Sequence, residues 1–168
     1  SLQDGMVIRF FGILSLLLGV VACEPSIEYQ GDLNYNLVPE PREIKIDKGV
    51  LHFPDGLFYV EGDPVFQDQS NFLSRQLTSF GLREFKSHQH VNIKLVLNQE
   101  LRFNPEAYTL RVEENGITLE SATIQGINRA ISSLEQLILL NMQEGEAFLP
   151  FINLEDSPRF GHRGLLLD

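Results

Sequence analysis

Two pairs of neighbouring carboxylates are the residues that first suggest acid–base chemistry. Glu113 and Glu114 precede an Asn-Gly turn signal, and Glu155 and Asp156 precede a Ser-Pro step. Hydrolysis by two carboxyl groups requires that they flank one bond, whereas sequence neighbours on an extended chain point in opposite directions. We therefore expect the first pair to be solvated, and Asp156 to bond nearby backbone amides or Arg159. Neither pair is expected to be catalytic.

The histidines give little support for a metal ion. His88 and His90 are two residues apart and would share one face of an extended segment, but no cysteine or second histidine cluster adds further ligands, and His52 is isolated. A polar loop before a strand at 91–97 is the favoured interpretation. The chain also lacks a glycine-rich phosphate loop and a nucleophile elbow, so no metal, cofactor or catalytic residue is predicted.

Cys23, the one cysteine, stands at an informative position. An apolar run at 10–22 precedes it, shorter than the roughly 20 residues of a transmembrane helix. Its ending, Val-Val-Ala-Cys, resembles the lipobox of bacterial lipoproteins, in which the cysteine is lipidated and becomes the mature N-terminus. We expect a cloning or translation remnant at 1–5, a signal peptide at 6–23 and a tether at 24–36. The protein would be exported and lipid-anchored in the bacterial cell envelope, in the periplasm or at the cell surface; an ordinary signal peptide with a chance cysteine is the alternative.

The final run, HRGLLLD, places the cation Arg163 and the carboxylate Asp168 on either side of an apolar strand pattern. The two residues have opposite parity, so without a bulge their side chains face opposite sides of a strand. A strand needs a partner strand, and none follows. The sequence therefore predicts that 158–168 begins a second domain, which the chain does not complete.

The elements that must position these residues form one α+β domain at 37–157. The sequence predicts an extended entry with alternating Ile44 and Ile46, and then the strands 57–60, 91–97, a hairpin at 107–121 turned by Asn115-Gly116, and 148–156. Consecutive strand patterns with a tight hairpin favour an antiparallel or mixed sheet.

Two amphipathic helices are expected to cover one face of this sheet. The first begins at Asp63-Pro64, with Asp63 as N-cap, and ends before Gly81. The second spans 126–142. Their predicted apolar stripes are Val65, Phe72, Leu73, Leu77 and Phe80 in the first, and Ile127, Ala130, Ile131, Leu134, Leu137 and Ile138 in the second.

The composition excludes one class of partner. The 168 residues suffice for one domain, and 23 acidic groups against 13 basic ones give a net charge of −10. Such a surface repels a phosphate backbone, so no nucleic-acid partner is expected.

Four stretches, taken in order, resemble family 20 glycoside hydrolases, the β-N-acetylhexosaminidases. They are LVPEPREI, EAYTLRVEENGITLES, GINRAISSLEQLI and INLEDSPRFGHRGLLLD, within residues 37–168, and the pattern D-x-P-R-F-x-x-R-G-L-x-L-D in the last is the specific one. The resemblance implies a small α+β domain, an antiparallel sheet with two helices on one face, that precedes a catalytic (β/α)₈ barrel. RGLLLD would be the first strand of that barrel.

The resemblance also implies roles for residues and a reaction. Arg163 would hydrogen-bond ring hydroxyls of the terminal sugar, a task that suits the fixed donors of a guanidinium. Asp168 would also contact substrate, at the strand end where barrel enzymes place their chemistry. In this family the acetamido group of the substrate attacks the anomeric carbon, while a Glu acts as general acid and an Asp orients the amide. Both are expected further along the barrel than residue 168.

The sequence thus predicts the non-catalytic N-terminal domain of a β-N-acetylhexosaminidase, inactive by itself. The implied substrate of the whole enzyme is a glycan with a terminal N-acetylhexosamine, and the lipid anchor would make a membrane its second partner. Two alternatives stay open: a stand-alone, membrane-tethered carbohydrate-binding or interaction module, and the leading domain of another glycosidase such as an O-GlcNAc hydrolase.

Overall fold

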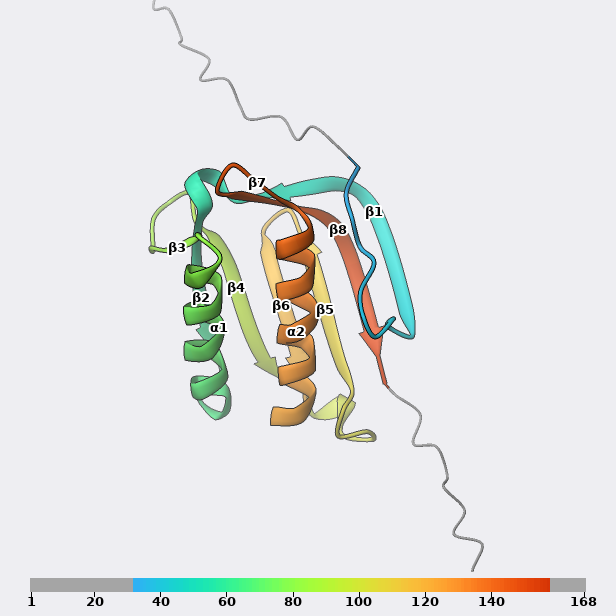
Figure 1. Ribbon diagram of the computed structural model, residues 1–168. Helices are drawn as coiled ribbons and strands as arrows, with labels where there is room; N and C mark the ends of the chain where they lie inside the picture. Colours follow the sequence, from blue (N-terminus) through green and yellow to red (C-terminus); the bar gives the residue numbers. More distant parts are fainter. Residues whose placement is uncertain (1–31, 158–168) are drawn as a thin grey trace, which may run out of the picture. The chain divides into compact units, whose positions relative to one another are not determined.

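A single mixed sheet organises residues 32–157, the part of the chain that the computed structural model describes (Figure 1). The strand order is β1-β8-β5-β6-β4-β2-β3, and β7 pairs with β8 outside this path. The neighbouring pairs β1·β8, β8·β5 and β5·β6 are antiparallel, whereas the pairs β6·β4, β4·β2 and β2·β3 are parallel. The strands are β1 Glu43–His52, β2 Leu57–Gly62, β3 Arg83–Glu84, β4 Val91–Leu97, β5 Tyr108–Glu113, β6 Gly116–Ser121, β7 Met142–Gln143 and β8 Glu146–Asp156.

Two helices, α1 Gln67–Ser79 and α2 Ile124–Leu140, lie side by side on one face of the sheet (Figure 1). The expected α+β class, with one mixed sheet and two helices, is therefore confirmed. Short 3₁₀ turns, η1 Pro54–Gly56, η2 Pro64–Phe66 and η3 Gln99–Leu101, join the strands and helices.

The core lies between the helices and the sheet, because alternate strand residues point at the helices. In β4, Val91, Ile93 and Leu95 are buried while Lys94 is exposed. All six residues of the predicted α2 stripe are buried. Full burial of one such aliphatic side chain contributes about 1.5–3 kcal/mol, so this layer holds the fold together.

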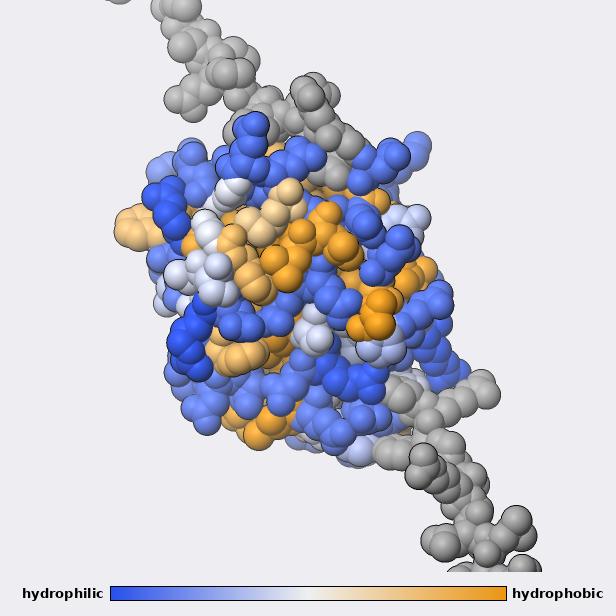
Figure 2. Space-filling view, viewed as in Figure 1, coloured by the Kyte–Doolittle hydropathy of each residue, from blue (hydrophilic) through white to orange (hydrophobic). Residues whose placement is uncertain are grey.

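The first helix departs from its predicted stripe. Leu73 and Leu77 are fully buried, but Val65 and Phe72 are 50% and 43% exposed. Phe72 precedes Leu73 by one residue and is therefore turned about 100° away from the core. Val65 lies before α1, in the 3₁₀ turn η2, where its neighbour Phe66 is the buried residue. Figure 2, which views the face that carries both helices, shows apolar patches among hydrophilic residues there.

Two local predictions are corrected by the backbone. Asp63 does not cap a helix with its side chain; its Oδ2 accepts a hydrogen bond of 2.6 Å from the Leu97 amide, and Pro64 begins a 3₁₀ turn. The hairpin loop lies one residue earlier than predicted, because Gly116 already pairs with Glu113 across it. Gly116 has φ of +138°, and an added Cβ would lie 2.4 Å from the Asn92 carbonyl oxygen.

The segment before β1 lies against α2 through two side-chain amides. Asn141 accepts from the Asn34 amide at 2.7 Å and donates to the Asn34 carbonyl at 2.6 Å. Gln136 binds the amide and carbonyl of Val38 in the same way, at 2.8 and 3.0 Å. Each amide thus satisfies a backbone donor and acceptor, as a neighbouring strand would.

Several sequence-based expectations lie outside residues 32–157. These are the remnant at 1–5, the signal peptide with Cys23, and the strand with Arg163 and Asp168. They stay predictions. No helix within 32–157 has the length and apolarity needed to cross a bilayer.

Candidate functional site

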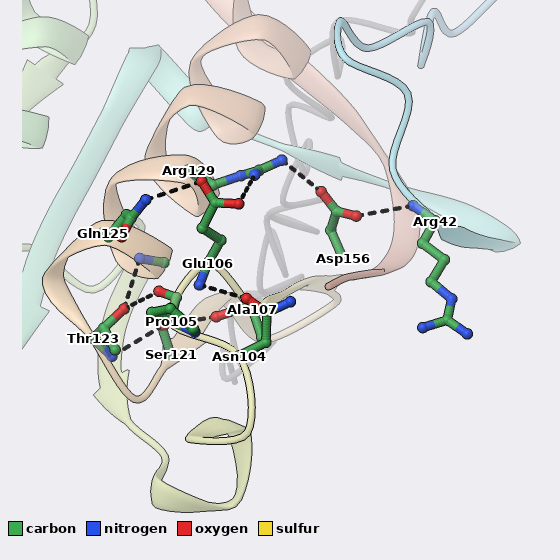
Figure 3. Close-up of polar contacts among 11 residues, drawn as sticks. Arg42, Asn104, Pro105, Glu106, Ala107, Ser121, Thr123, Gln125, Arg129 and Asp156 are labelled. Carbon is green, nitrogen blue, oxygen red and sulfur yellow. Dashed lines mark hydrogen bonds and ion pairs between the residues drawn. The ribbon is translucent and has the colours of Figure 1, made fainter. Parts of the chain in front are cut away.

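A cluster of ion-paired and hydrogen-bonded residues gathers where β8 ends, and the stretch with the Arg163 motif follows it in sequence. We call it the Asp156 cluster; its members are Arg42, Glu106, Gln125, Arg129 and Asp156 (Figure 3). They come from the segment before β1, the loop before β5, α2 and β8. Four segments of the chain therefore meet at one point.

Asp156 is the centre of this cluster, and its carboxylate is fully engaged. Its Oδ1 accepts a hydrogen bond from the Arg42 backbone amide at 3.2 Å, and its Oδ2 accepts one from Arg129 Nη2 at 2.9 Å. The Asp156 side chain is only 8% exposed. The expected bonding of Asp156 to nearby backbone amides is wrong, because the amide that it binds belongs to Arg42 in a distant segment; Arg159, the other predicted partner, lies outside the described residues. Glu155, its neighbour, is exposed, as the alternation predicts.

Arg129 joins two carboxylates. Besides Asp156, its Nη1 lies 3.3 Å from Glu106 Oε2, and the Gln125 amide donates to Glu106 Oε1 at 2.9 Å. One guanidinium between two acids leaves each carboxylate with a charged partner. Arg129 is the one cation within α2. Its isolation beside an apolar stripe is the feature of the sequence from which an ion pair could have been predicted.

The loop that carries Glu106 is fixed by hydrogen bonds around the start of α2 (Figure 3). Thr123 is the N-cap of α2: its Oγ1 accepts from the Gly126 amide at 2.9 Å and donates to the Pro105 carbonyl. Ser121 donates to the Ala107 carbonyl at 2.7 Å. These bonds hold Glu106 beside Arg129.

Tyr108 lies beneath the cluster and is buried. Its hydroxyl group lies 2.7 Å from Ser133 Oγ. Burial is the main cause that raises the pKa of Tyr108, and Asp156 adds to it, while the Ser133 hydrogen bond and Arg129 act in the opposite direction. The phenol therefore stays protonated at neutral pH and serves as a packed hydrogen-bonding group.

A groove of about 340 Å³ opens beside the cluster. Exposed Phe103, half-buried Thr109 and the Arg42 side chain are among the residues that line it, and Arg42 Nη1 donates to Ser157 Oγ at 3.2 Å. Both carboxylates of the cluster, Asp156 and Glu106, are paired with Arg129, whereas Glu155 is exposed at the groove. The arrangement joins chain segments and fixes the position from which the chain leaves β8.

The histidines lie apart from this cluster. His52 stacks on Phe148, with ring centroids 4.5 Å apart, and its Nε2 lies 2.5 Å from Glu146 Oε2. His88 is exposed, and His90 bonds to the Ser87 backbone and meets the edge of the Tyr59 ring. Within 32–157 there is no group of three or more potential metal ligands. The Glu113 and Glu114 pair is exposed, as predicted.

Comparison with known proteins assigns this domain to a protein family. The family model "Glycosyl hydrolase family 20, domain 2" matches residues 34–157. Beta-hexosaminidase subunit A1 of Dictyostelium discoideum is 24% identical over 170 residues, covering 96% of this chain and 30% of that protein. The beta-hexosaminidase of Vibrio furnissii is 28% identical over 134 residues, covering 79% and 21%. The chain therefore spans less than a third of these relatives.

Two solved structures contain a region with a similar fold. An inactive mutant of the GH20 exo-β-N-acetylglucosaminidase from Vibrio harveyi matches with a TM-score of 0.61 and 25% identity, covering 73% of this chain and 19% of that one. The same enzyme in complex with N-acetylglucosamine matches with a TM-score of 0.60 at 22% identity, a likeness that shows the fold alone; coverage is again 73% and 19%.

Proposed function

Because the chain belongs to glycosyl hydrolase family 20, whose domain 2 it carries, we propose that it is the non-catalytic accessory domain of a β-N-acetylhexosaminidase. The observation that carries the proposal is the match of that domain over residues 34–157. The names of the matched relatives, which are beta-hexosaminidases, support the same assignment.

The geometry supports a non-catalytic role for residues 32–157. Glycoside hydrolysis needs a carboxylic acid that can give up a proton near the scissile bond. In the Asp156 cluster both Asp156 and Glu106 are held by Arg129, at 2.9 and 3.3 Å. These ion pairs tie both carboxylates to the protein's own side chains and leave neither directed at a ligand.

The whole enzyme would remove terminal N-acetylhexosamine from glycans with retention of configuration. In this proposal the substrate acetamido group attacks the anomeric carbon, and the catalytic Glu and Asp belong to a barrel that follows this domain. Arg163 would bind hydroxyls of the terminal sugar, and Asp168 would contact substrate at the end of the same strand. The Asp156 cluster would then fix the start of the segment that leads to them.

The proposed location is the cell envelope, with the protein held by a lipid on Cys23. The support is the apolar run at 10–22 that ends in Val-Val-Ala-Cys. Mass spectrometry of the protein expressed in a Gram-negative host should show an acylated N-terminal Cys23. Cleavage elsewhere with an unmodified cysteine would refute this part of the proposal and leave the accessory role untouched.

The accessory role is tested in two steps. Purified 168-residue chain should release no nitrophenol above background from the nitrophenyl β-glycoside of N-acetylglucosamine, since one general acid alone is worth about 10²–10⁴-fold in rate. Turnover that persists through a further purification step would contradict it. Genomic DNA beyond codon 168 should encode a barrel with an adjacent Asp-Glu pair; an immediate stop codon would favour the stand-alone module.

A further inference from the structure

The β2 strand is paired along its length on one side only. On that side β4 pairs with Phe58–Gly62. On the other side β3 pairs with only Leu57 and Phe58, because β3 is two residues long. Within residues 32–157 no strand lies beside the rest of this edge. Tyr59–Gly62 therefore forms a free edge that begins where β3 ends.

The backbone groups on this free edge can be assigned from their neighbours. The Phe58 carbonyl accepts from the Phe85 amide at 2.9 Å, so Phe58 faces the β3 side. The Asp63 amide donates to the Leu95 carbonyl at 2.9 Å, so Asp63 faces the β4 side. Because backbone groups alternate along a strand, Val60 and Gly62 direct their amides and carbonyls to the open side. These four groups are spaced for one more strand.

A groove of about 510 Å³ lies along this edge, between β2 and α1. This volume is within the range of ligand sites, roughly 300–1,000 Å³. The wall on the helix side is one polar stripe at helical spacing, made of Gln67, Ser70, Asn71, Ser74 and Arg75. A strand edge on one side and a helix on the other is the geometry in which extended peptides add to a sheet.

The charges of the groove are unequally satisfied. Glu61 is 3.5 Å from Lys86 Nζ, and Glu84 accepts a hydrogen bond from Ser74. Arg75 is exposed and lines the groove, and among the described residues it has no hydrogen bond or ion pair. A carboxylate on the occupant would supply the partner that Arg75 lacks.

We propose that the groove between α1 and the free edge of β2 binds an extended peptide as an added strand, with an acidic side chain of that peptide against Arg75. Its backbone bonds the amides and carbonyls of Val60 and Gly62. A sugar fits less well, because the Tyr59 ring, the aromatic group of the groove on which it could stack, already contacts Lys86 Nζ, 4.9 Å from its centroid, and the His90 ring.

The opposite edge of the sheet does not offer the same site. The outermost strand there, β1, carries Lys45, Asp47 and Lys48 and has a register shift between Ile46 and Val50. Charges and bulges are the features by which edge strands avoid pairing with other chains. The free stretch of β2 has Gly62 and a ready groove instead, so peptide addition is specific to this edge.

A library of random heptapeptides with blocked termini, selected against the full chain, provides the probe. We expect enrichment of peptides with one Asp or Glu, and slower hydrogen exchange of the Val60 and Gly62 amides when such a peptide is bound. Arg75→Glu should weaken that binding by about tenfold or more. Lys48→Glu, the same change in charge at the opposite edge, should change it by less than about twofold.

Each outcome of this experiment either supports or overturns peptide binding in the groove. Hydrogen exchange is measured on the wild-type chain, so it decides the matter even if a variant folds poorly. Absence of any enriched peptide would overturn the proposal, and so would a peptide that leaves the Val60 and Gly62 amides unprotected. Protection of these amides by chitooligosaccharide without peptide binding would assign the groove to a glycan. Protection that rises with protein concentration alone would assign it to a second copy of the chain.

Discussion

Asp156 joins three segments of the chain through a single carboxylate, and it is the residue whose loss is expected to cost most in the cluster. Its side chain is 8% exposed and that of Arg129 26% exposed, so the pair is largely removed from water. Breaking such a pair by removing one partner leaves the other charge poorly solvated.

Asp156→Ala is therefore expected to lower the free energy of unfolding by about 2–3 kcal/mol, below the full cost of a buried charge because Arg129 keeps Glu106. Urea denaturation followed by circular dichroism measures this. The matched control is Glu113→Ala on the exposed hairpin, expected to change stability by less than about 0.5 kcal/mol. Equal effects of the two variants would show that the cluster does not hold the fold.

Glu135 should make stability depend on pH. Burial raises the pKa of Glu135, while the Gln76 side chain partly offsets this, and its Oε1 has no hydrogen-bond partner. The folded state thus favours the protonated acid, and this contribution, present below the unfolded pKa, is lost as the pH rises through the folded pKa. Glu135→Gln should raise the urea midpoint at pH 7 and leave it nearly unchanged at pH 3. A gain of equal size at both values would contradict the assignment, and exposed Glu113→Gln serves as control.

Among the secondary-structure elements, those with a clear alternating or helical pattern of apolar residues were predicted correctly from the sequence. The strand 91–97 agrees with β4 at both ends, and the second helix begins and ends two residues before its predicted bounds. β3 and β7 were missed, because two residues are too few to show a period. The Asp156 cluster was found only in part: its Arg42 and Arg129 partners are 114 and 27 residues away.

The N-cap residue of α2 was not identified from the sequence. The second helix was predicted to begin at Gly126, yet it begins at Ile124, and Thr123 Oγ1 accepts a hydrogen bond from the Gly126 amide. Thr123→Ala should destabilise the fold by about 1 kcal/mol, within the usual range of 0.5–2 for an N-cap.

Thr78→Ala is the control for this change, since Thr78 lies within α1, is exposed and bonds only the Ser74 carbonyl. It should change stability by less than about 0.5 kcal/mol. If urea midpoints of the two variants coincide, the Thr123 cap does not contribute.

For the molecule as a whole, the described residues contain their own core. All the buried hydrophobic residues in the main cluster lie between Leu37 and Leu154. Removing residues 158–168 should therefore leave the far-ultraviolet circular dichroism and the urea midpoint unchanged, and should improve solubility because Leu165–Leu167 is an apolar run. An unfolded product would show that the domain needs residues beyond 157.

The strand order carries a consequence for the moment of synthesis. β1, the first strand made, has β8, the last, as its one strand partner in the described chain, with Glu43 opposite Glu155. After β1 ends at His52, a ribosome must translate 93 further residues before β8 begins at Glu146. Until then β1 has no strand to pair with, and such distant pairings form slowly. Under the export proposed above, a chain whose first strand is still unpaired would remain extended enough to pass through a secretion channel.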